Sequence, residues 1–420
     1  MMRIKKLLAL VLSAVIAMSL ISSCKSEDDG VNSVIGSYSS LDPELLSDYD
    51  YTRYKGQDLV LNVANWGEYM SLNEPEMLDV NEAFERLTGI TVNYNTVATN
   101  EALYSKLKSG GAAYDIIIPS DYMISKMISE GMLQKLNFDN IPNFKNILPE
   151  YVNPVYDPEN EYSVPYLWGM VVIIYNTTMV DEEITSWASL WDEKYTNNIL
   201  MFNNPRDAFG IAQKYLGFSQ NTEDSDELLQ CMRLLESQKE IVQGYVMDEI
   251  FDKMEGGSAA IAPYYAGDAV TMMDDNPDLY YCIPEEGTNL FVDAICIPTT
   301  AENKELAEMY INFLCEPEVA LANCEYTGYS TPNGAAFELL DEEVRTNPLQ
   351  YPSAEYLESN TETFINLSDE ANAEMQSLWN QLKIGNSSPW LVPIFLVLLI
   401  AATIFVNVYR ARKKQRSEHL

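Results

Sequence analysis

The fold is decided first by the run DLVLNV at residues 58–63, an apolar stretch of the kind that forms a buried parallel strand. A helical spacing of apolar residues follows over 76–87 and stops at Gly89, a fitting C-terminal cap. Residues 90–97 then alternate between apolar and polar as a strand does. Strand and helix patterns that alternate in this way predict a parallel α/β sheet.

The alternation continues along the chain, on both sides of a loop region rich in Asn and Pro at residues 137–160. Apolar runs predict further strands at 114–118, 170–175, 199–202, 259–262 and 290–297. Helical spacing predicts a helix start at 187–191 and helices at 100–108, 121–130, 206–216, 302–314 and 317–326. Two sets of α/β elements predict two lobes, and we expect the chain to cross between them more than once.

The N-terminal segment has the pattern of a secretory signal. Three basic residues precede an apolar run at 7–21, which is too short for a good membrane span. The run ends in ISSC, which resembles the bacterial lipobox, so we expect residues 1–23 to be a lipoprotein signal peptide and Cys24 to be lipidated. An ordinary signal cleaved near the same place is the alternative. Residues 24–56 lack periodicity and are expected to form a flexible stalk.

The C-terminal segment predicts a second membrane attachment. Residues 390–409 carry no charge and are long enough to cross about 30 Å of hydrocarbon, with Trp390 and Tyr409 at the two interfaces. We therefore expect a transmembrane helix at 389–409, a buried core helix being the alternative. The basic tail at 410–420 is expected in the cytoplasm by the positive-inside rule. The rest of the mature chain would then lie on the outer face of the cytoplasmic membrane.

The chain is strongly acidic, with 63 Asp and Glu residues against 26 Lys and Arg. Such a field repels nucleic acid and concentrates cations, so it permits a cationic ligand, although plain solubility explains it equally well. The single histidine, His419, lies in the basic tail, which excludes His-based triads, dyads and metal sites outside the membrane. We expect no catalytic group, no metal and no cofactor.

Five cysteines follow Cys24, and none of them forms a C-x-x-C pair. An odd number cannot pair completely within one chain. We expect mostly buried thiols, with a bridge between Cys315 and Cys324 as the least implausible disulfide.

Five local strings carry a resemblance to a known family. They are NWGEY at 65–69, YDIIIPSDY at 114–122, YSVPYLWG at 162–169, SWASLW at 186–191 and GYSTPN at 328–333. In order and spacing they resemble the spermidine/putrescine-binding proteins of ABC importers, and the resemblance covers roughly residues 57 to 386.

The resemblance implies a periplasmic-binding-protein-like (type II) α/β fold with two lobes and a ligand cleft between them. We expect lobe 1 at 57–160 and 290–330, and lobe 2 at 161–289 and 331–386. Neither the stalk nor the C-terminal helix is a usual part of the family pattern.

The resemblance also implies which residues contact a ligand. Aromatic rings would line the methylene groups of a polyamine and face its cations, and carboxylates would pair with its ammonium groups. The implied ligand-binding residues are Trp66, Glu68, Tyr69, Ser120, Tyr122, Asn204, Asp207, Tyr265, Phe291, Asp293 and Tyr329.

The chain departs from the family at several of these places. Tyr265 and Phe291 stand where Trp is frequent, and Gly67 stands where Thr or Ser is typical. Asn204 replaces a second Asp of the spermidine-binding members, and a Gln contact near residue 365 has no clear counterpart. One carboxylate fewer suits fewer ammonium groups, so we expect putrescine rather than spermidine.

By this resemblance the chain is the substrate-binding component of an ABC importer, served by permease subunits in the membrane and a cytoplasmic ATPase, and it is not an enzyme. One alternative is a protein of the same fold for another small cation, an amino acid or ferric iron. Adjacent tyrosines such as Tyr264 and Tyr265, or Tyr280 and Tyr281, could be cited for iron, but neighbours in a strand point to opposite faces. An exported hydrolase built on paired carboxylates, or a sensory or structural surface protein, also stays open.

Overall fold

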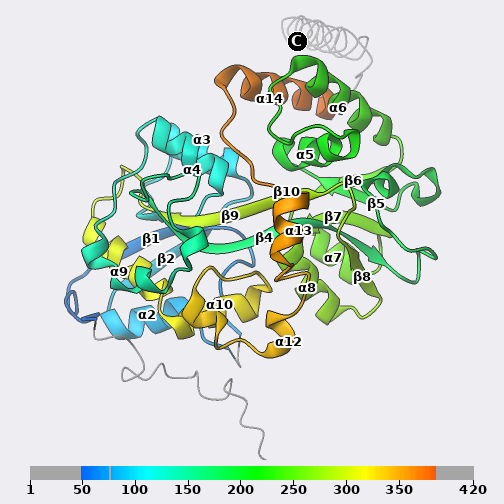
Figure 1. Ribbon diagram of the computed structural model, residues 1–420. Helices are drawn as coiled ribbons and strands as arrows, with labels where there is room; N and C mark the ends of the chain where they lie inside the picture. The colour runs from blue at the N-terminus through cyan, green and yellow to red at the C-terminus, as the bar shows by residue number, and fades with distance from the viewer. Residues whose placement is uncertain (1–48, 75–76, 385–420) are drawn as a thin grey trace, which may run out of the picture.

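The computed structural model describes residues 49–74 and 77–384 (Figure 1). The strands are β1 Val60–Asn65, β2 Thr91–Thr96, β3 Ile116–Ile117, β4 Ser163–Asn176, β5 Ile199–Phe202, β6 Val242–Val246, β7 Ile261–Tyr265, β8 Leu279–Cys282, β9 Thr288–Cys296 and β10 Thr361–Glu362. The α-helices are α2 Val80–Thr88, α3 Asn100–Lys108, α4 Asp121–Ser129, α5 Pro205–Leu216, α6 Ser225–Gln238, α7 Glu249–Glu255, α8 Ala266–Asp275, α9 Lys304–Leu314, α10 Pro317–Thr327, α11 Gly334–Phe337, α12 Glu342–Arg345, α13 Ala354–Asn360 and α14 Asp369–Ile384. Short 3-10 helices are η2 Phe138–Asn140, η3 Pro142–Asn146, η4 Pro149–Tyr151, η5 Trp187–Trp191 and η6 Glu193–Tyr195.

Two long strands join the two halves of the molecule. Within the described residues the strand order is β2-β1-β3-β9-β4-β7-β5-β6, with β10 paired to β9 and β8 paired to β4. The first part of β4, residues 163–170, pairs with β9, and its last part pairs with β7 and β8. β4 and β9 therefore run through the middle of the molecule and connect one lobe, built on β1 to β3, to a second lobe built on β5 to β8 (Figure 1).

In the first lobe the sheet is covered on both faces, because successive residues of a strand point to opposite sides. Val63 packs in one cluster with Phe84 of α2 and Phe313 of α9. Its neighbour Ala64 packs in another cluster with Leu103 of α3. Helices α2, α9 and α10 thus cover one face and α3 and α4 the other, below and above the strands in Figure 1.

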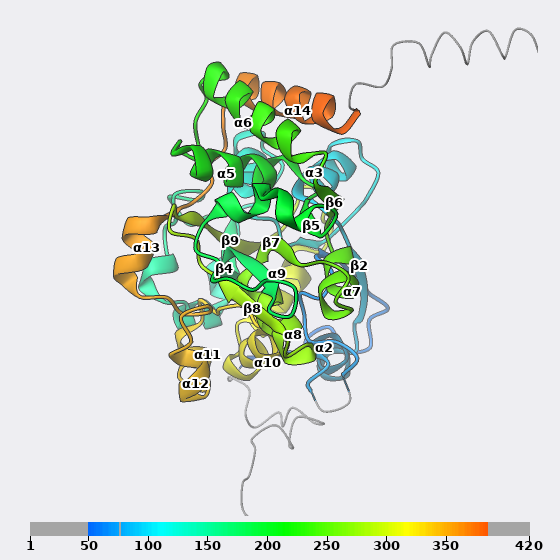
Figure 2. The ribbon, with the colours of Figure 1, turned by 90° about the vertical axis from the view of Figure 1, so that its right-hand side faces the viewer.

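The second lobe has the same layered construction. Its core gathers residues of β5 and β7 with those of α5, α6, α7, α8 and α14. Helices α6 and α14 lie side by side in both views, on the outer side of α5 (Figures 1 and 2). The ring of Trp187 in η5 is fully buried and its Nε1 donates to the carbonyl oxygen of Gly287 at 2.9 Å.

The prediction of a parallel sheet is wrong at the centre of the molecule. β1 pairs in parallel with β2 and β3, and β5 pairs in parallel with β6 and β7. β9, however, runs antiparallel to β3 and β4, and β4 runs antiparallel to β7. A buried apolar run reports that a strand is covered on both faces, and it carries no information about direction, so the crossing strands could not be recognised as antiparallel.

Individual elements differ from the prediction mainly in extent. The helix at 100–108 and the strand at 199–202 are found at the predicted bounds, as α3 and β5. β4 begins at Ser163 rather than at 170, and the helix start at 187–191 is the 3-10 helix η5. Elements such as α6, β6, α8 and α14 were not predicted, although the buried Leu228, Cys231 and Leu235 of α6 have helical spacing. We expected residues 331–386 in the second lobe, but α11 packs with α10 of the first lobe around buried Cys324. The remaining lobe boundaries stay a prediction.

The expected stalk reaches too far into the fold. Tyr51 is buried, its hydroxyl donates to Glu316 Oε1 at 2.6 Å, and it accepts from Asn312 Nδ2 at 2.8 Å. Residues 49–56 are therefore part of the first lobe, held by α9 and by the residue that precedes α10. The rest of the expected stalk lies outside the described residues.

The disulfide expected between Cys315 and Cys324 is wrong. Within the described part of the chain, the five cysteines are buried free thiols, as expected for most of them. The Cys324 thiol donates to the carbonyl oxygen of Tyr329 at 2.9 Å, which keeps it inside its own packing cluster.

Both expected membrane attachments fall outside the described residues: the signal peptide at 1–23, Cys24, the helix at 389–409 and the tail at 410–420. Between residues 49 and 384, leaving aside 75–76, no helix is long and apolar enough to cross a bilayer.

Candidate ligand-binding site

A cavity of about 90 Å³ lies where the two lobes meet, and both lobes contribute to its walls. The structure brings nearly all of the predicted ligand-binding residues to this cavity. Those that line it are Trp66, Tyr69, Ser120, Tyr122, Asn204, Asp207, Tyr265, Phe291, Asp293 and Tyr329.

The topology explains why these residues meet. Trp66 follows β1 and Ser120 follows β3 in the first lobe. Asn204 follows β5, and Tyr265 is the last residue of β7, in the second lobe. The carboxyl ends of parallel strands face one edge of their sheet, and ligands of open α/β sheets bind there. The cavity therefore lies where the binding edges of the two lobes face each other.

Aromatic rings form a continuous wall of the cavity. The ring of Tyr69 meets that of Tyr329 edge-on with centroids 4.8 Å apart, and Phe291 meets Tyr265 in the same manner at 5.3 Å. Phe291 and Tyr329 complete the series at 6.1 Å. A side chain at Gly169 would place its Cβ 3.1 Å from Phe291 and 3.3 Å from Tyr329, so the bare backbone of β4 is what lets the rings sit there. Such a wall suits methylene groups and ring–cation contacts.

Asp293 of β9 presents a buried carboxylate to the cavity. Its side chain is almost fully buried, and β9 meets Ser120 there through an isolated β-bridge. Burial raises the pKa of the Asp293 carboxyl to about 6, and the hydroxyl groups of Ser120 and Tyr69 lower it in part. Oδ1 has no hydrogen-bond partner within the described part of the chain. This oxygen can accept a hydrogen bond from a ligand donor.

Asp207, in the first turn of α5, presents a second carboxylate. Its Oδ2 accepts from the Tyr265 hydroxyl and from Asn204 Nδ2, both at 2.7 Å. Burial raises the pKa of Asp207, and these two donors counteract the effect. Asn204 also caps α5, since its Oδ1 accepts from the Asp207 backbone nitrogen at 2.9 Å. Asn204 therefore orients the carboxylate of Asp207 in addition to lining the cavity.

A third carboxylate, Asp268, was not predicted. It lies in the first turn of α8, is buried, and accepts from the Tyr329 hydroxyl at 2.9 Å. Burial raises its pKa well above the ordinary value, with Tyr329 acting in the opposite direction. Gly267 permits this contact, because a Cβ at that position would lie 2.2 Å from the Tyr329 ring. The position follows Tyr265 by one helical turn, but α8 was not predicted, so the sequence did not point to it.

A fourth carboxylate, Asp248, was also missed, and it depends on Gly67. Asp248 precedes α7 in the second lobe, and a Cβ on Gly67 of the first lobe would lie 2.6 Å from its Oδ2. Burial raises the pKa of Asp248, as do the charges of Glu249 and Glu68, while the Tyr264 hydroxyl lowers it. The absence of a side chain at Gly67, noted as a departure from the family, thus leaves the space that this carboxylate occupies.

A cation and further acids line the Asp207 side of the cavity. The cation is Arg206, which lines the cavity and is only 4% exposed to solvent. The Asp121 carboxylate accepts from the backbone nitrogens of Tyr122 at 2.6 Å and Val292 at 3.2 Å, and burial raises its pKa to about 8. The Tyr122 hydroxyl donates to Glu101 Oε1 at 3.0 Å. Arg206 is therefore the positive group of a cavity wall in which acids predominate.

Two expectations about individual residues need correction. Glu68 lies outside the cavity lining, and its carboxylate accepts from the Tyr326 hydroxyl at 2.7 Å. Tyr264 and Tyr265 both line the cavity, so the argument that adjacent tyrosines point to opposite faces is wrong here. β7 ends at Tyr265 and the chain turns into α8, which removes the strict alternation of a strand.

Two α/β lobes joined by crossing strands, with a cavity between the lobes, are features of solute-binding proteins. The chain is a member of the bacterial extracellular solute-binding protein family, whose model matches residues 112–360. The family membership implied by the five sequence strings is thereby confirmed.

Similar curated proteins cover most of the chain. The spermidine/putrescine-binding periplasmic protein of Salmonella typhimurium is 36% identical over 76% of this chain and 90% of its own length. The Escherichia coli protein of the same description is 37% identical over 70% of this chain and 84% of its own length. The putrescine-binding periplasmic protein of Pseudomonas aeruginosa is 30% identical over 78% and 92%.

Solved structures show the same architecture. A spermidine/putrescine ABC transporter substrate-binding protein from Streptococcus pneumoniae, in complex with calcium and HEPES, is 38% identical with a TM-score of 0.65. That match covers 78% of this chain and 99% of the other. The two-lobed fold expected from the sequence is confirmed by this likeness.

Proposed function

We propose that this protein captures a polyamine in the cavity between its lobes and delivers it to an ABC importer. The observation that carries the proposal is the convergence of buried carboxylates and an aromatic wall on one cavity. Asp207, Asp248, Asp268 and Asp293 come from separate elements, and burial raises the pKa of each one. A raised pKa means that the charged form is poorly solvated, and a cationic ligand relieves that cost.

The ligand chemistry follows from the two kinds of wall. Ammonium groups gain charge-assisted hydrogen bonds from the carboxylates, and Asp293 Oδ1 is placed to accept one. The methylene chain between the ammonium groups packs against Tyr69, Phe291 and Tyr329. Neither feature alone selects a polyamine, since carboxylates suit any cation and rings suit any apolar group. The presence of both in one cavity suits charges spaced by methylene groups.

Closure of the lobes around a ligand would distinguish the loaded protein from the empty one. Asp293 belongs to a crossing strand and Asp268 to the second lobe, so a ligand bound to both is held from two sides. Only contacts made preferentially in the closed state can shift the equilibrium toward closure. Permease subunits in the membrane, coupled to a cytoplasmic ATPase, would then recognise the closed form.

The attachment to the membrane is part of the proposal. Lipidation of Cys24 and a helix at 389–409 would both hold the lobes at the outer face of the cytoplasmic membrane. The proteins with which the chain shares 36–37% identity are described as periplasmic, and a relative from Treponema pallidum with 26% identity and a TM-score of 0.65 is described as a lipoprotein. These descriptions support an extracytoplasmic position.

Isothermal calorimetry with putrescine, cadaverine, spermidine and spermine tests the proposal directly. We expect at least one polyamine to bind with a dissociation constant below 10 µM, roughly 7 kcal/mol of binding free energy. A thermal-shift panel with amino acids and ferric iron covers the other solutes. Stabilisation by one of those, with none from any polyamine, would refute the proposal.

Putrescine is still the ligand that we expect, but the number of carboxylates in the cavity no longer supports this preference over spermidine. Asn204 stands in the place of one carboxylate, whereas Asp248 and Asp268 add two carboxylates to the cavity lining. Calorimetry that shows spermidine bound tenfold more tightly than putrescine, about 1.4 kcal/mol, would reverse this preference.

A further inference from the structure

A third crossing segment reaches the cavity from the second lobe. We call residues 361–365 the strap. Its first part, β10, pairs in parallel with β9, where Thr361 and Glu362 lie opposite Thr288 and Asn289. Two residues further on, Phe364 lines the cavity, as does Asn289. The strap therefore connects the sheet of the crossing strands to the wall of the ligand site.

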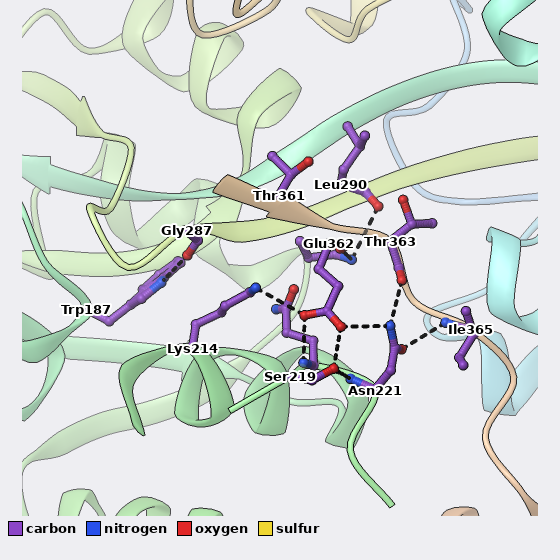
Figure 3. Close-up of polar contacts among 12 residues, drawn as sticks. Trp187, Lys214, Ser219, Asn221, Gly287, Leu290, Thr361, Glu362, Thr363 and Ile365 are labelled. Carbon is purple, nitrogen blue, oxygen red and sulfur yellow. Dashed lines mark hydrogen bonds and ion pairs between the residues drawn. The ribbon is translucent and has the colours of Figure 1, made fainter. Parts of the chain in front are cut away.

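The carboxylate of Glu362 is the centre of the polar contacts that hold the strap (Figure 3). It accepts from Lys214 Nζ at 3.1 Å, the Gln220 backbone nitrogen at 2.9 Å, Asn221 Nδ2 at 3.1 Å and the Ser219 hydroxyl. Burial raises the pKa of Glu362, but these donors outweigh burial and hold it below the ordinary value. Glu362 therefore stays charged at neutral pH, and it ties the strap to the end of α5 and the loop after it.

The main chain of the strap is fixed by the same loop. Asn221 Nδ2 donates to the Thr363 carbonyl oxygen at 2.9 Å, and the Ile365 backbone nitrogen donates to Asn221 Oδ1 at 3.0 Å. Asn289 Nδ2 donates to the Glu362 carbonyl oxygen at 3.2 Å from the other side. The backbone on both sides of Phe364 thus has little freedom to move.

The strap in turn holds Arg206. One nitrogen, Nη2, donates to Asn221 Oδ1 at 2.8 Å and to the Ile365 carbonyl oxygen at 3.2 Å. The guanidinium lies over the Phe364 ring at 4.3 Å and over the Tyr122 ring at 5.7 Å. Arg206 keeps its positive charge at this wall because guanidinium groups do not deprotonate in proteins.

The charge of Arg206 makes the side of the cavity beside Phe364 electrostatically different from the side beside Asp248 and Asp268. On the side of Asp248 and Asp268, no cation is among the groups that shift the pKa of either carboxyl. On the side of Phe364, Arg206 lies among the acids Asp121, Asp207 and Glu101, and its positive charge offsets part of theirs. An ammonium group placed beside Phe364 would approach a like charge, and that repulsion is strong where water is excluded.

We propose that Glu362 is a positioning residue, which holds Phe364 and Arg206 as an end wall and so favours ligands with two ammonium groups over longer ones with three. This inference rests on the proposed polyamine function and adds a structural cause for selectivity. A diamine can use Asp268 and Asp293 and stop short of Arg206. A third ammonium group would be driven toward the end wall.

The test compares putrescine and spermidine affinities by calorimetry of the purified full-length chain and of Glu362→Gln, which keeps the shape of the side chain and removes its charge. We expect the wild-type protein to bind putrescine at least tenfold more tightly than spermidine. We expect Glu362→Gln to reduce that ratio at least fivefold. The matched control is Glu358→Gln, an exposed glutamate on α13, which should leave the ratio unchanged.

Selectivity separates positioning from a purely structural role, because a loss of stability alone does not change the ratio of two affinities. If Glu362→Gln folds and keeps the wild-type ratio within twofold, the inference is wrong, whatever happens to its melting temperature. If that variant does not fold, Ser219→Ala removes one donor to the same carboxylate and should shift the ratio in the same direction. Wild-type preference for spermidine overturns the inference alone, whereas a wild-type protein that binds no polyamine overturns the proposed function with it.

Discussion

Asp293 shows how a buried carboxylate can serve binding at a cost to the stability of the empty protein. The substitution Asp293→Asn keeps the volume of the side chain and removes the charge that faces the cavity. We expect polyamine binding to weaken by about 2–5 kcal/mol, the usual range for truncating one partner of a buried charge pair. Calorimetry with putrescine measures this directly, and binding within about twofold of wild type would show that Asp293 has no such role.

The same substitution should stabilise the ligand-free protein at neutral pH. Because the pKa of Asp293 is about 6 in the fold, against 3.8 ordinarily, the folded state binds this proton more tightly than the unfolded chain does. The contribution of Asp293 to stability is thus present at low pH and is lost as the pH rises through 6. We expect Asp293→Asn to gain about 1–3 kcal/mol in the free energy of unfolding at pH 7.5. Urea unfolding without ligand checks it, and a gain of similar size at pH 4 would contradict the explanation.

Polyamine affinity should depend on pH through the same carboxylate. Polyamine ammonium groups stay protonated in this range, whereas the Asp293 carboxyl becomes protonated as the pH falls through about 6. Binding must then displace that proton, so we expect the dissociation constant for putrescine to rise at least fivefold between pH 7.5 and pH 5.0. Asp293→Asn should show a smaller rise. An equal pH dependence in both proteins would assign the effect to another group.

At the scale of elements, the loop after β1 and the loop before α7 meet across the cavity. Gly67 in the first loop leaves room for Asp248 in the second, because a Cβ there would lie 2.6 Å from Asp248 Oδ2. We expect Gly67→Ser to displace that carboxylate and to weaken putrescine binding about tenfold, or about 1.4 kcal/mol. Gly244→Ser in β6 is the matched control, since nothing lies within 4 Å of the added Cβ there. Equal affinity in Gly67→Ser and wild type would show that Asp248 takes no part in binding.

At the scale of the whole molecule, β4, β9 and β10 are the segments that join the lobes. Strands paired to one another can bend as a unit, and contacts from both lobes to one ligand favour the closed arrangement. We expect the radius of gyration from small-angle X-ray scattering to fall when putrescine is added. Asp293→Asn should need a higher putrescine concentration for the same change. Scattering that stays unchanged at a saturating concentration would show that binding does not close the lobes.

Much of the architecture could be predicted because it depends on neighbours in the chain. Helix α3 and strand β5 were found at their predicted bounds, since apolar spacing reports directly which side of an element is buried. The resemblance of the five strings to the family implied Trp66, Tyr122 and Tyr329 as ligand-binding residues, and the structure places all three in the cavity lining. The directions of β4 and β9 could not be predicted, because pairing depends on segments more than a hundred residues apart.

The sequence by itself determined that this is an acidic α/β protein with the strings of a solute-binding family and with His419 as its single histidine. Only the tertiary structure decided which acids share the ligand's surroundings. Asp248 enters the cavity because Gly67 of the other lobe leaves it space, and Arg206 is held there by a strap from the far end of the chain. The physical reason is that desolvation and charge–charge interaction depend on distances in space, and those distances are set by packing between segments remote in sequence.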